Sequence, residues 1–193
     1  ETAMPSEFNY EADRDVADYI YRSEDLVNLA GRKYHSKRNH LAQFGRTYSW
    51  TYEDLGDNNM QDCIALAKEW CIASGGCGSD NGLDKEACAL KKTFEHYKEL
   101  AFSGGLIRID GKAVAFTIGE EINSKAFVLH FEKALAGYNG LYAAINNEFA
   151  KRHLSGYEYI NREEDLGIEG LRKAKLSYNP EILLEKYIAF RKG

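Results

Sequence analysis

Leu106-Ile107-Arg108-Ile109-Asp110-Gly111-Lys112-Ala113-Val114-Ala115-Phe116-Thr117-Ile118-Gly119 is the stretch of sequence that decides the fold. Two extended, mostly apolar segments flank an Asp-Gly pair. Asp-Gly in this setting favours the tight turn of a β-hairpin, because both turn residues can adopt positive φ. The stretch therefore predicts two antiparallel strands joined at Asp110-Gly111.

The segments after this hairpin alternate between strand and helix patterns. A third strand is expected at 126–132, followed by helix 139–154, strand 157–161, helix 168–176 and strand 185–191. The resulting order, β-β-β-α-β-α-β, predicts an α/β (α+β) protein with a mixed central sheet flanked by helices.

The segments before the hairpin have mainly helical patterns. Ser23 is a candidate N-cap, and Asp84 is another. The expected elements are helix 23–30, a basic helix after it, a short extended piece at 50–55, helix 60–73, a glycine-rich linker at 74–82 and helix 84–102. We therefore expect an N-terminal helical extension before the sheet.

The domain organisation follows from these patterns. The chain has 193 residues and is 44% hydrophobic, which is ample for a buried core. We expect a leader or linker at 1–18 and one domain at 19–193, with a mainly helical part at 19–104 and a sheet core at 105–193. No apolar run approaches the ~18 residues that span a bilayer, and no signal peptide is evident, so we expect a cytoplasmic location. The chain does not begin with Met, so the sequence is also consistent with a fragment whose N-terminal part is missing.

The cysteines and histidines lack the spacing of metal sites. Cys63, Cys71, Cys77 and Cys88 contain no CxxC pair, and the five histidines are scattered, so we expect free thiols and no metal. Cys63 and Cys71 share one stripe of the 60–73 helix, which predicts that both are buried.

Two cationic segments occur in a chain of net charge -5. Gly31 to His40 contains four Lys or Arg, and Leu171 to Pro180 follows an acidic run. Such segments favour an anionic ligand, and together they suggest one composite site. Lys37 falls inside an apolar helical stripe, where it must snorkel, pair with a carboxylate or hold an anion. A solvated basic face with a snorkelling Lys37 is the simpler interpretation.

Longer strings of residues are similar to a known family, the phosphatidylglycerol lysyltransferase C-terminal-like family. The resemblance covers most of the chain from about Asp18 onward. The strings that carry it are Tyr19-Ile20-Tyr21 with Asp25-Leu26, the basic segment from Gly31 to His40, Ala115-Phe116-Thr117-Ile118-Gly119-Glu120, Asn161-Arg162-Glu163-Glu164-Asp165-Leu166-Gly167, and Leu171 to Tyr178 with Pro180.

The resemblance implies a GNAT-like acyltransferase fold, related to the Fem peptidyltransferases that use aminoacyl-tRNA. It also implies a tandem of two GNAT-like halves, of which this chain matches the second. Ordinary GNAT enzymes bind the coenzyme A pyrophosphate with a Q/R-x-x-G-x-G/A loop at a helix N-terminus. Lys133 to Leu141 does not reproduce that loop. We therefore expect no resident cofactor, and we favour aminoacyl-tRNA over acyl-coenzyme A as the co-substrate, with the tRNA acceptor end as a partner.

Three residues are candidates for catalysis. Lys175 lies in a lysine-plus-aromatic setting that resembles the C-terminal motif of the Fem enzymes, and Tyr178 shares its helix face. Lys175 would face the reacting carbonyl, or it would simply pair with Glu163 or Glu164. Asp165 is expected to be the N-cap of the 168–176 helix, and a base that binds the acceptor is the alternative.

Seven residues are candidates for substrate binding. Arg162 would anchor a carboxylate or phosphate, or else tie Glu132 on a neighbouring strand. The full set is Arg32, Lys33, Lys37, Arg38, Asn39, Arg162 and Arg172. The favoured function is transfer of an aminoacyl or acyl group to an amine or hydroxyl acceptor, with a lipid acceptor only weakly supported. A noncatalytic half that binds an anionic ligand, or acts as a scaffold, is the alternative.

Overall fold

A computed structural model describes residues 7–75 and 83–192. Its centre is a seven-stranded mixed sheet with the strand order β2-β3-β4-β5-β6-β1-β7. Every neighbouring pair is antiparallel except β5 and β6, which are parallel. The strands are β1 (Phe8–Arg22), β2 (Trp50–Asp54), β3 (Ser103–Ile109), β4 (Lys112–Asn123), β5 (Ala126–Ala134), β6 (Tyr159–Asn161) and β7 (Ile182–Arg191).

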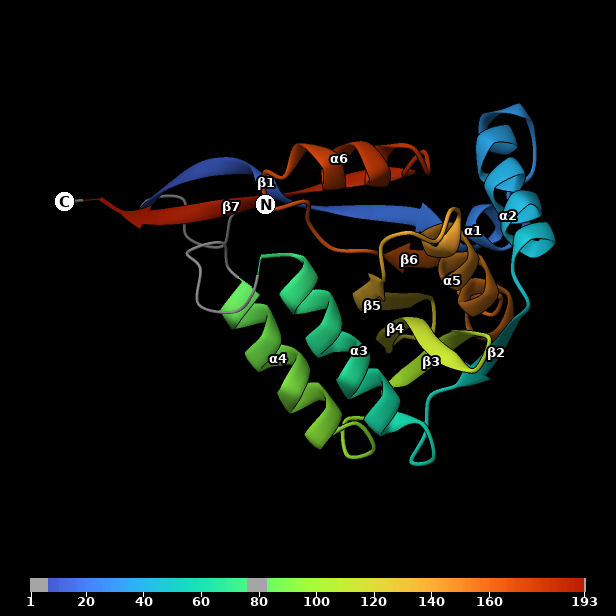
Figure 1. The fold of residues 1–193 in the computed structure, drawn as a ribbon. Helices are drawn as coiled ribbons and strands as arrows, with labels where there is room; N and C mark the ends of the chain where they lie inside the picture. Colours follow the sequence, from blue (N-terminus) through green and yellow to red (C-terminus); the bar gives the residue numbers. More distant parts are fainter. Residues whose placement is uncertain (1–6, 76–82, 193) are drawn as a thin grey trace.

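The helices pack around this sheet. Helices α3 and α4 lie side by side, and α6 runs along the β1/β7 pair (Figure 1). None of the helices in the described ranges is long and apolar enough to cross a membrane. The helical segments are α1 (Ser23–Asn28), the 3-10 turn η1 (Arg32–Tyr34), α2 (His35–Thr47), α3 (Met60–Ala73), α4 (Leu83–Glu95), α5 (Leu141–Phe149) with its π-helical continuation η2 (Ala150–Leu154), and α6 (Glu169–Leu176).

The predicted hairpin is confirmed. β3 and β4 pair antiparallel, and Asp110 and Gly111 have φ of 49° and 81°, the two positive values that the tight turn requires. The order β3-β4-β5-α5-β6-α6-β7 confirms the predicted order for this part of the chain. The prediction of a mixed sheet flanked by helices is therefore confirmed.

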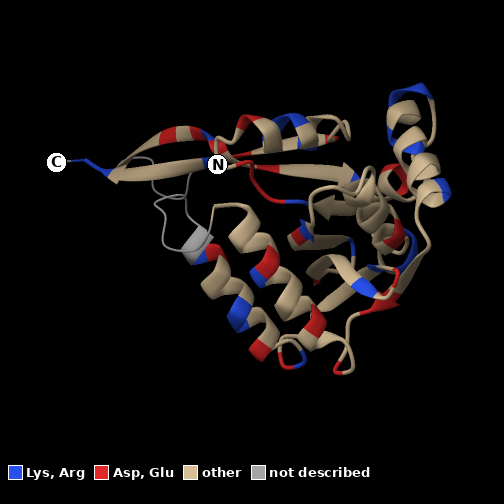
Figure 2. Ribbon diagram, in the orientation of Figure 1, with Lys and Arg blue, Asp and Glu red and all other residues tan. Residues whose placement is uncertain are grey.

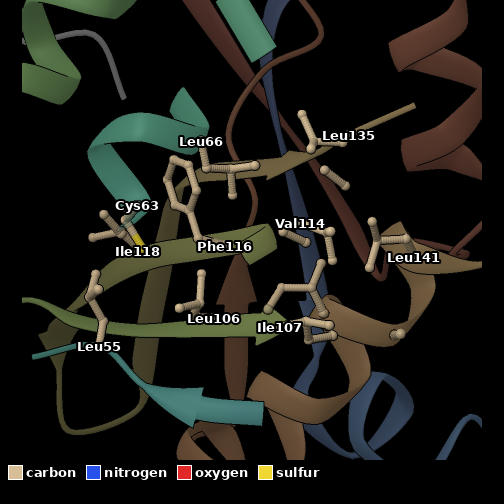
Figure 3. Packing of buried hydrophobic residues seen from close by; sticks show 14 of the residues in the cluster. Leu55, Cys63, Leu66, Leu106, Ile107, Val114, Phe116, Ile118, Leu135 and Leu141 are labelled. Atoms are coloured by element: carbon tan, nitrogen blue, oxygen red, sulfur yellow. The ribbon is translucent and has the colours of Figure 1, made fainter. Parts of the chain in front are cut away.

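Two groups of buried side chains hold the sheet to its helices. The first joins β3 and β4 to α3 and α5, with Phe116 beside Leu66 and with Val114 and Ile107 toward Leu141 (Figure 3). The second lies around β1, β6 and η2 and is rich in tyrosine. It includes Tyr19, Tyr21, Tyr34, Phe149, Ile160 and Tyr178. The second group supports the site described below.

The predicted N-terminal helical extension is wrong, because the described chain begins with a strand. β1 spans Phe8–Arg22 and pairs with both β6 and β7, so much of the stretch expected to be a leader lies in the sheet. Acidic residues, which are rare in strands, concealed the pattern, and a register shift between Asp13 and Asp18 breaks the alternation. Ion pairs offset this acidity, since Asp18 contacts Lys186 at 2.6 Å.

Several predicted boundaries also differ. The N-cap of α1 is Arg22, and the Ser23 hydroxyl instead donates to the carbonyl of Leu154. Helix α4 ends at Glu95, and β7 begins at Ile182 rather than 185. Most of the predicted linker, 76–82, lies outside the described residues.

The cysteine prediction is correct for the burial of Cys63 and Cys71 and wrong for the redox state of Cys71. Cys63 and Cys71 are buried in α3, as the helical stripe indicated. Cys63 and Cys88 are free thiols, but Cys71 is disulfide-bonded, and Cys77 lies outside the described residues. Neither burial nor the lack of a CxxC pair excludes a disulfide, because its formation depends on the distance between two cysteines in the fold.

Gly140 begins α5 where α2 crosses close by, and a side chain there should destabilise the protein. Its φ is 83°, and an added Cβ would lie 2.6 Å from the carbonyl oxygen of His40. We expect Gly140→Ala to lower the free energy of unfolding by more than the ~1–2 kcal/mol of left-handed backbone strain alone. Gly137→Ala is the matched control, because Gly137 has φ of 92° and open space around it. Equal losses in urea denaturation would contradict the close approach of α2 and α5.

Candidate functional site

Strand β5 pairs with β6 over only part of its length. These parallel strands pair only where Ala126 to Val128 faces Tyr159 to Asn161, whereas β5 continues to Ala134. Beyond the paired part, a side-chain ion pair joins the two elements: Arg162 Nη2 donates to Glu132 Oε1 at 3.0 Å. The alternative prediction that Arg162 ties Glu132 is confirmed.

Tyr178 lies between two cations beside this ion pair. Its ring is buried, with the Arg162 guanidinium 4.9 Å and the Lys37 Nζ 3.8 Å from the ring centroid. Burial raises the pKa of Tyr178 to about 12, so the phenol stays neutral. The faces of the ring can thus stabilise nearby positive charge without adding a negative one.

Lys37 reaches this cluster from α2. Its Nζ donates to the Ser177 hydroxyl at 2.6 Å. Burial, followed by the positive charge of Arg162, lowers the pKa of Lys37 to about 8. Lys37 is therefore half-buried, whereas Arg32 is exposed.

Lys175 extends from α6 toward Arg162 and is held by backbone groups. Its Nζ donates to the carbonyl of Arg162 and, at 3.2 Å, to that of Glu163. It does not pair with the side chain of Glu163 or Glu164, as one interpretation of the sequence expected. Burial, followed by the charge of Arg162, lowers the pKa of Lys175 to about 8. Lys175 thus fixes the backbone that carries Arg162.

Tyrosines of the second core group hold the C-terminal end of α6. The Tyr21 hydroxyl donates to the Lys175 carbonyl at 2.8 Å, and the Tyr34 hydroxyl donates to the Tyr178 carbonyl at 2.8 Å. Carbonyls at a helix end lack intrahelical partners, so these bonds satisfy them and fix the direction of α6. Lys175 and Tyr178 are positioned by β1 and η1 in this way.

Asp165 and Arg172 belong to a second, adjacent cluster. Arg172 contacts both Asp165 oxygens at 2.8 Å, and the Tyr19 hydroxyl donates to Asp165 at 2.5 Å. The hydrogen bonds from Arg172, with further ones from Tyr19 and the Gly167 amide, hold the pKa of the buried Asp165 well below its usual range. Figure 2 shows the opposite charges that β1 and α6 bring together here.

The predicted N-cap role of Asp165 is wrong, because the residue before α6 is Ile168. Asp165 instead accepts the Gly167 amide at 2.9 Å in the turn before the helix. Tyr19 joins the two clusters, since the Lys175 Nζ lies 5.7 Å from its ring centroid.

The other predicted binding residues make contacts away from Arg162. Arg38 donates to the carbonyls of Leu29 and Gly31, where it closes the end of α1. Lys33 pairs with Asp25 at 2.9 Å, and Asn39 contacts His35. Of the predicted residues, Lys37, Lys175, Tyr178 and Arg162 therefore lie together.

Two residues near Arg162 were missed as site residues. Asn146 of α5 is 1% exposed, and its Nδ2 donates to Glu132 Oε2 at 3.0 Å. Glu132 therefore joins Arg162 to Asn146. A buried Asn-Asn pair within the apolar inner side of the α5 sequence was the available signal.

A separate apolar groove of about 690 Å³ lies between α3 and α4. Lys133 borders it, pairs with Glu86 at 2.6 Å, and lies over the Trp70 ring. Because Lys133 follows Glu132 on β5, its side chain points to the opposite face of the sheet. Among the described residues, no three His, Cys, Asp or Glu side chains gather as a metal site requires.

A family model described as "Phosphatidylglycerol lysyltransferase, C-terminal" matches residues 2–190 of this chain. One solved structure, a conserved protein of unknown function from Bacteroides thetaiotaomicron VPI-5482, is 46% identical with a TM-score of 0.93, and the match covers 98% of this chain and 64% of that one.

Two more distant structures are similar in fold. L-PGS from Bacillus licheniformis is 15% identical with a TM-score of 0.66, and the match covers 97% of this chain and 62% of that one. A tandem GNAT protein from the clavulanic acid biosynthesis pathway is 9% identical with a TM-score of 0.53, and the match covers 93% of this chain and 54% of that one. The fold is therefore GNAT-like, and this chain spans less than two thirds of each of these three solved chains.

The lowered pKa of Lys175 predicts how stability changes with pH. Between about pH 8 and the ordinary lysine value of 10.5, the unfolded chain binds a proton that the folded protein has released. The free energy of unfolding therefore rises with pH in this window. We expect the wild type to gain stability relative to Lys175→Met from pH 8 to 10.5 in urea denaturation.

Lys173→Met, an exposed lysine of the same helix, controls for the loss of one positive charge. A stability difference between wild type and Lys175→Met that is flat or falls with pH would show that Lys175 is not desolvated in the folded protein.

Proposed function

The chain belongs to the phosphatidylglycerol lysyltransferase C-terminal family, and from this premise we propose that it is a GNAT-like aminoacyltransferase domain. It would move an aminoacyl group from aminoacyl-tRNA to an amine or hydroxyl acceptor. The observation that carries this proposal is the partly buried cationic cluster where β5 and β6 stop pairing, in which Arg162 and Lys37 flank Tyr178 and Lys175 holds the Arg162 backbone.

The cluster suits the chemistry of acyl transfer. Attack on an ester carbonyl places negative charge on its oxygen, and a fixed donor in a water-poor site stabilises that charge. Arg162 is such a donor, because its Nη1 is buried without a hydrogen-bond partner among the described residues. We propose that Arg162 stabilises the oxyanion and that Lys175 positions the backbone that carries Arg162.

Lys37 is suited to handle the proton of the acceptor. An amine or hydroxyl loses a proton as it attacks, and a base works best when its pKa lies near the working pH. The pKa of Lys37 is about 8, and its Nζ is held by one hydroxyl and one ring rather than by carbonyls or a carboxylate. Lys37 in its neutral form would accept this proton.

Asp165 is less suited to act as a base. Its carboxylate is buried and its pKa lies well below the usual range, chiefly because of Arg172. A weakly basic carboxylate that already accepts several hydrogen bonds is a poor proton acceptor. We propose that Asp165 and Arg172 hold the turn before α6, which keeps Lys175 and Tyr178 in place.

The packing of α2 favours aminoacyl-tRNA over acyl-coenzyme A. In ordinary GNAT enzymes the helix N-terminus after the central strand binds pyrophosphate. Here the corresponding helix is α5, and the His40 carbonyl lies against Gly140 at its start. The exposed cation Arg32 lies in η1, directly before α2, and is suited to binding a tRNA phosphate. Use of charged tRNA would place the reaction in the cytoplasm.

The alternative is a noncatalytic half that binds an anionic ligand. One observation favours it: the candidate cations Lys175, Arg172 and Arg38 are engaged by protein carbonyls or carboxylates. This reading leaves Lys37 and the Arg162 Nη1 to bind the anion without chemistry.

Transfer assays separate the two functions. We expect the purified protein to transfer the aminoacyl group of charged tRNA to an amine or lipid hydroxyl, and not to turn over acetyl-coenzyme A. Lys37→Met should slow transfer by about two powers of ten, the typical effect of losing one catalytic polar group. Arg46→Gln, an exposed arginine of α2, is the control and should change the rate little.

The outcome that contradicts the proposal is acetyl-coenzyme A turnover without use of charged tRNA. Binding of charged tRNA without transfer to any acceptor would favour the noncatalytic alternative.

A further inference from the structure

Asn146 has a buried acceptor atom that the protein does not use. Its side chain is buried in α5, and its Nδ2 donates to Glu132 Oε2. The Oδ1 has no hydrogen-bond partner in the part of the chain that the structure describes. Because a carboxylate only accepts hydrogen bonds, the Nδ2 must face Glu132, and this fixes the Oδ1 on the other side.

Arg162 donates to the same carboxylate, and within the described residues it has an unpaired donor atom where Asn146 has an unpaired acceptor atom. Its Nη2 donates to Glu132 Oε1 at 3.0 Å, while its Nη1 is buried and lacks a partner within the described ranges. One carboxylate therefore positions two side chains, of which one retains a free acceptor and the other a free donor. Buried polar atoms are rarely left unpaired in native proteins, so a bound ligand is a natural partner for both.

We propose that Glu132, Asn146 and Arg162 form a subsite that recognises the free α-amino group of an aminoacyl ester. The α-amino group donates to Asn146 Oδ1, and the ester carbonyl next to it accepts from Arg162 Nη1. This inference rests on the proposed function and adds the feature of the donor that the site selects. A plain acyl group, or an aminoacyl group whose nitrogen is blocked, leaves Asn146 unpaired.

The charges around the subsite are consistent with a neutral acceptor such as asparagine. Lys37 and Lys175 lie near Arg162, and Glu132 supplies the negative charge beside Asn146. The α-amino group of an ester is less basic than a lysine side chain, so it can bind without its extra proton. A neutral amine still donates to Asn146 Oδ1, and the nearby cations then repel it little.

Binding of two stable analogues tests the subsite without turnover. The probes are 3′-amino-3′-deoxyadenosine acylated with alanine and the same nucleoside acylated with propionate, which lacks only the α-amino group. We expect the wild-type protein to bind the alanyl analogue about 10- to 100-fold more tightly by calorimetry, because an unmet buried acceptor weakens binding. Asn146→Leu should reduce this preference to about onefold.

Asn147→Leu is the matched control on the same helix. Asn147 is also buried, but its Nδ2 donates to the carbonyls of Leu26 and Val27, so its role is structural. Asn147→Leu should lower the melting temperature and leave the preference between the analogues unchanged. An equal loss of preference in both variants would overturn the assignment to Asn146.

The other outcomes of the binding test distinguish a failure of the subsite proposal from a failure of the proposed function. Equal binding of both analogues by the wild type overturns the subsite and leaves the aminoacyltransferase proposal standing. Binding of neither analogue overturns both. If Asn146→Leu fails to fold, the ratio of the wild-type affinities for the two analogues still tests the subsite.

Discussion

The ion pair between Arg162 and Glu132 is the interaction on which the rest of the site depends. It joins β5 to the chain leaving β6 at the point where the parallel strands cease to pair. Both partners are largely shielded from water, and removing one partner of such a pair typically costs about 3–5 kcal/mol, because the other charge is left buried. Loss of either partner would therefore destabilise the place where the two strands separate.

Each neighbouring group acts on one end of this pair. Lys175 holds the backbone of Arg162, Tyr178 stacks on its guanidinium, and Asn146 binds the far oxygen of Glu132. Tyr21 in turn fixes the end of α6 through the Lys175 carbonyl. The long first strand thus contributes to the site although it carries none of its charged groups. The network also explains why two lysines with lowered pKa lie so close to a permanent cation: burial and packing place them there, and the tyrosine ring stabilises the charge.

Local patterns in the sequence were enough to predict the hairpin at Asp110-Gly111 and helix Met60–Ala73, because turn chemistry and helical periodicity are local. β1 was missed because its acidic residues are stabilised by partners distant in sequence, as Asp15 is by Arg172. The candidate site could be predicted only in part, because some of its residues also depend on partners distant in sequence. Lys37 was singled out as a cation within an apolar stripe, whereas the role of Asn146 depends on a carboxylate of another element.

The most direct measurement is a crystal structure of the protein with a stable amide analogue of 3′-aminoacyl adenosine. We expect the aminoacyl group to lie beside the unpaired end of β5, with its carbonyl oxygen on Arg162 and the Arg162–Glu132 pair intact. An analogue bound in the groove between α3 and α4, or at the loop from Gly137 to Gly140, would contradict the assignment of the site to Arg162.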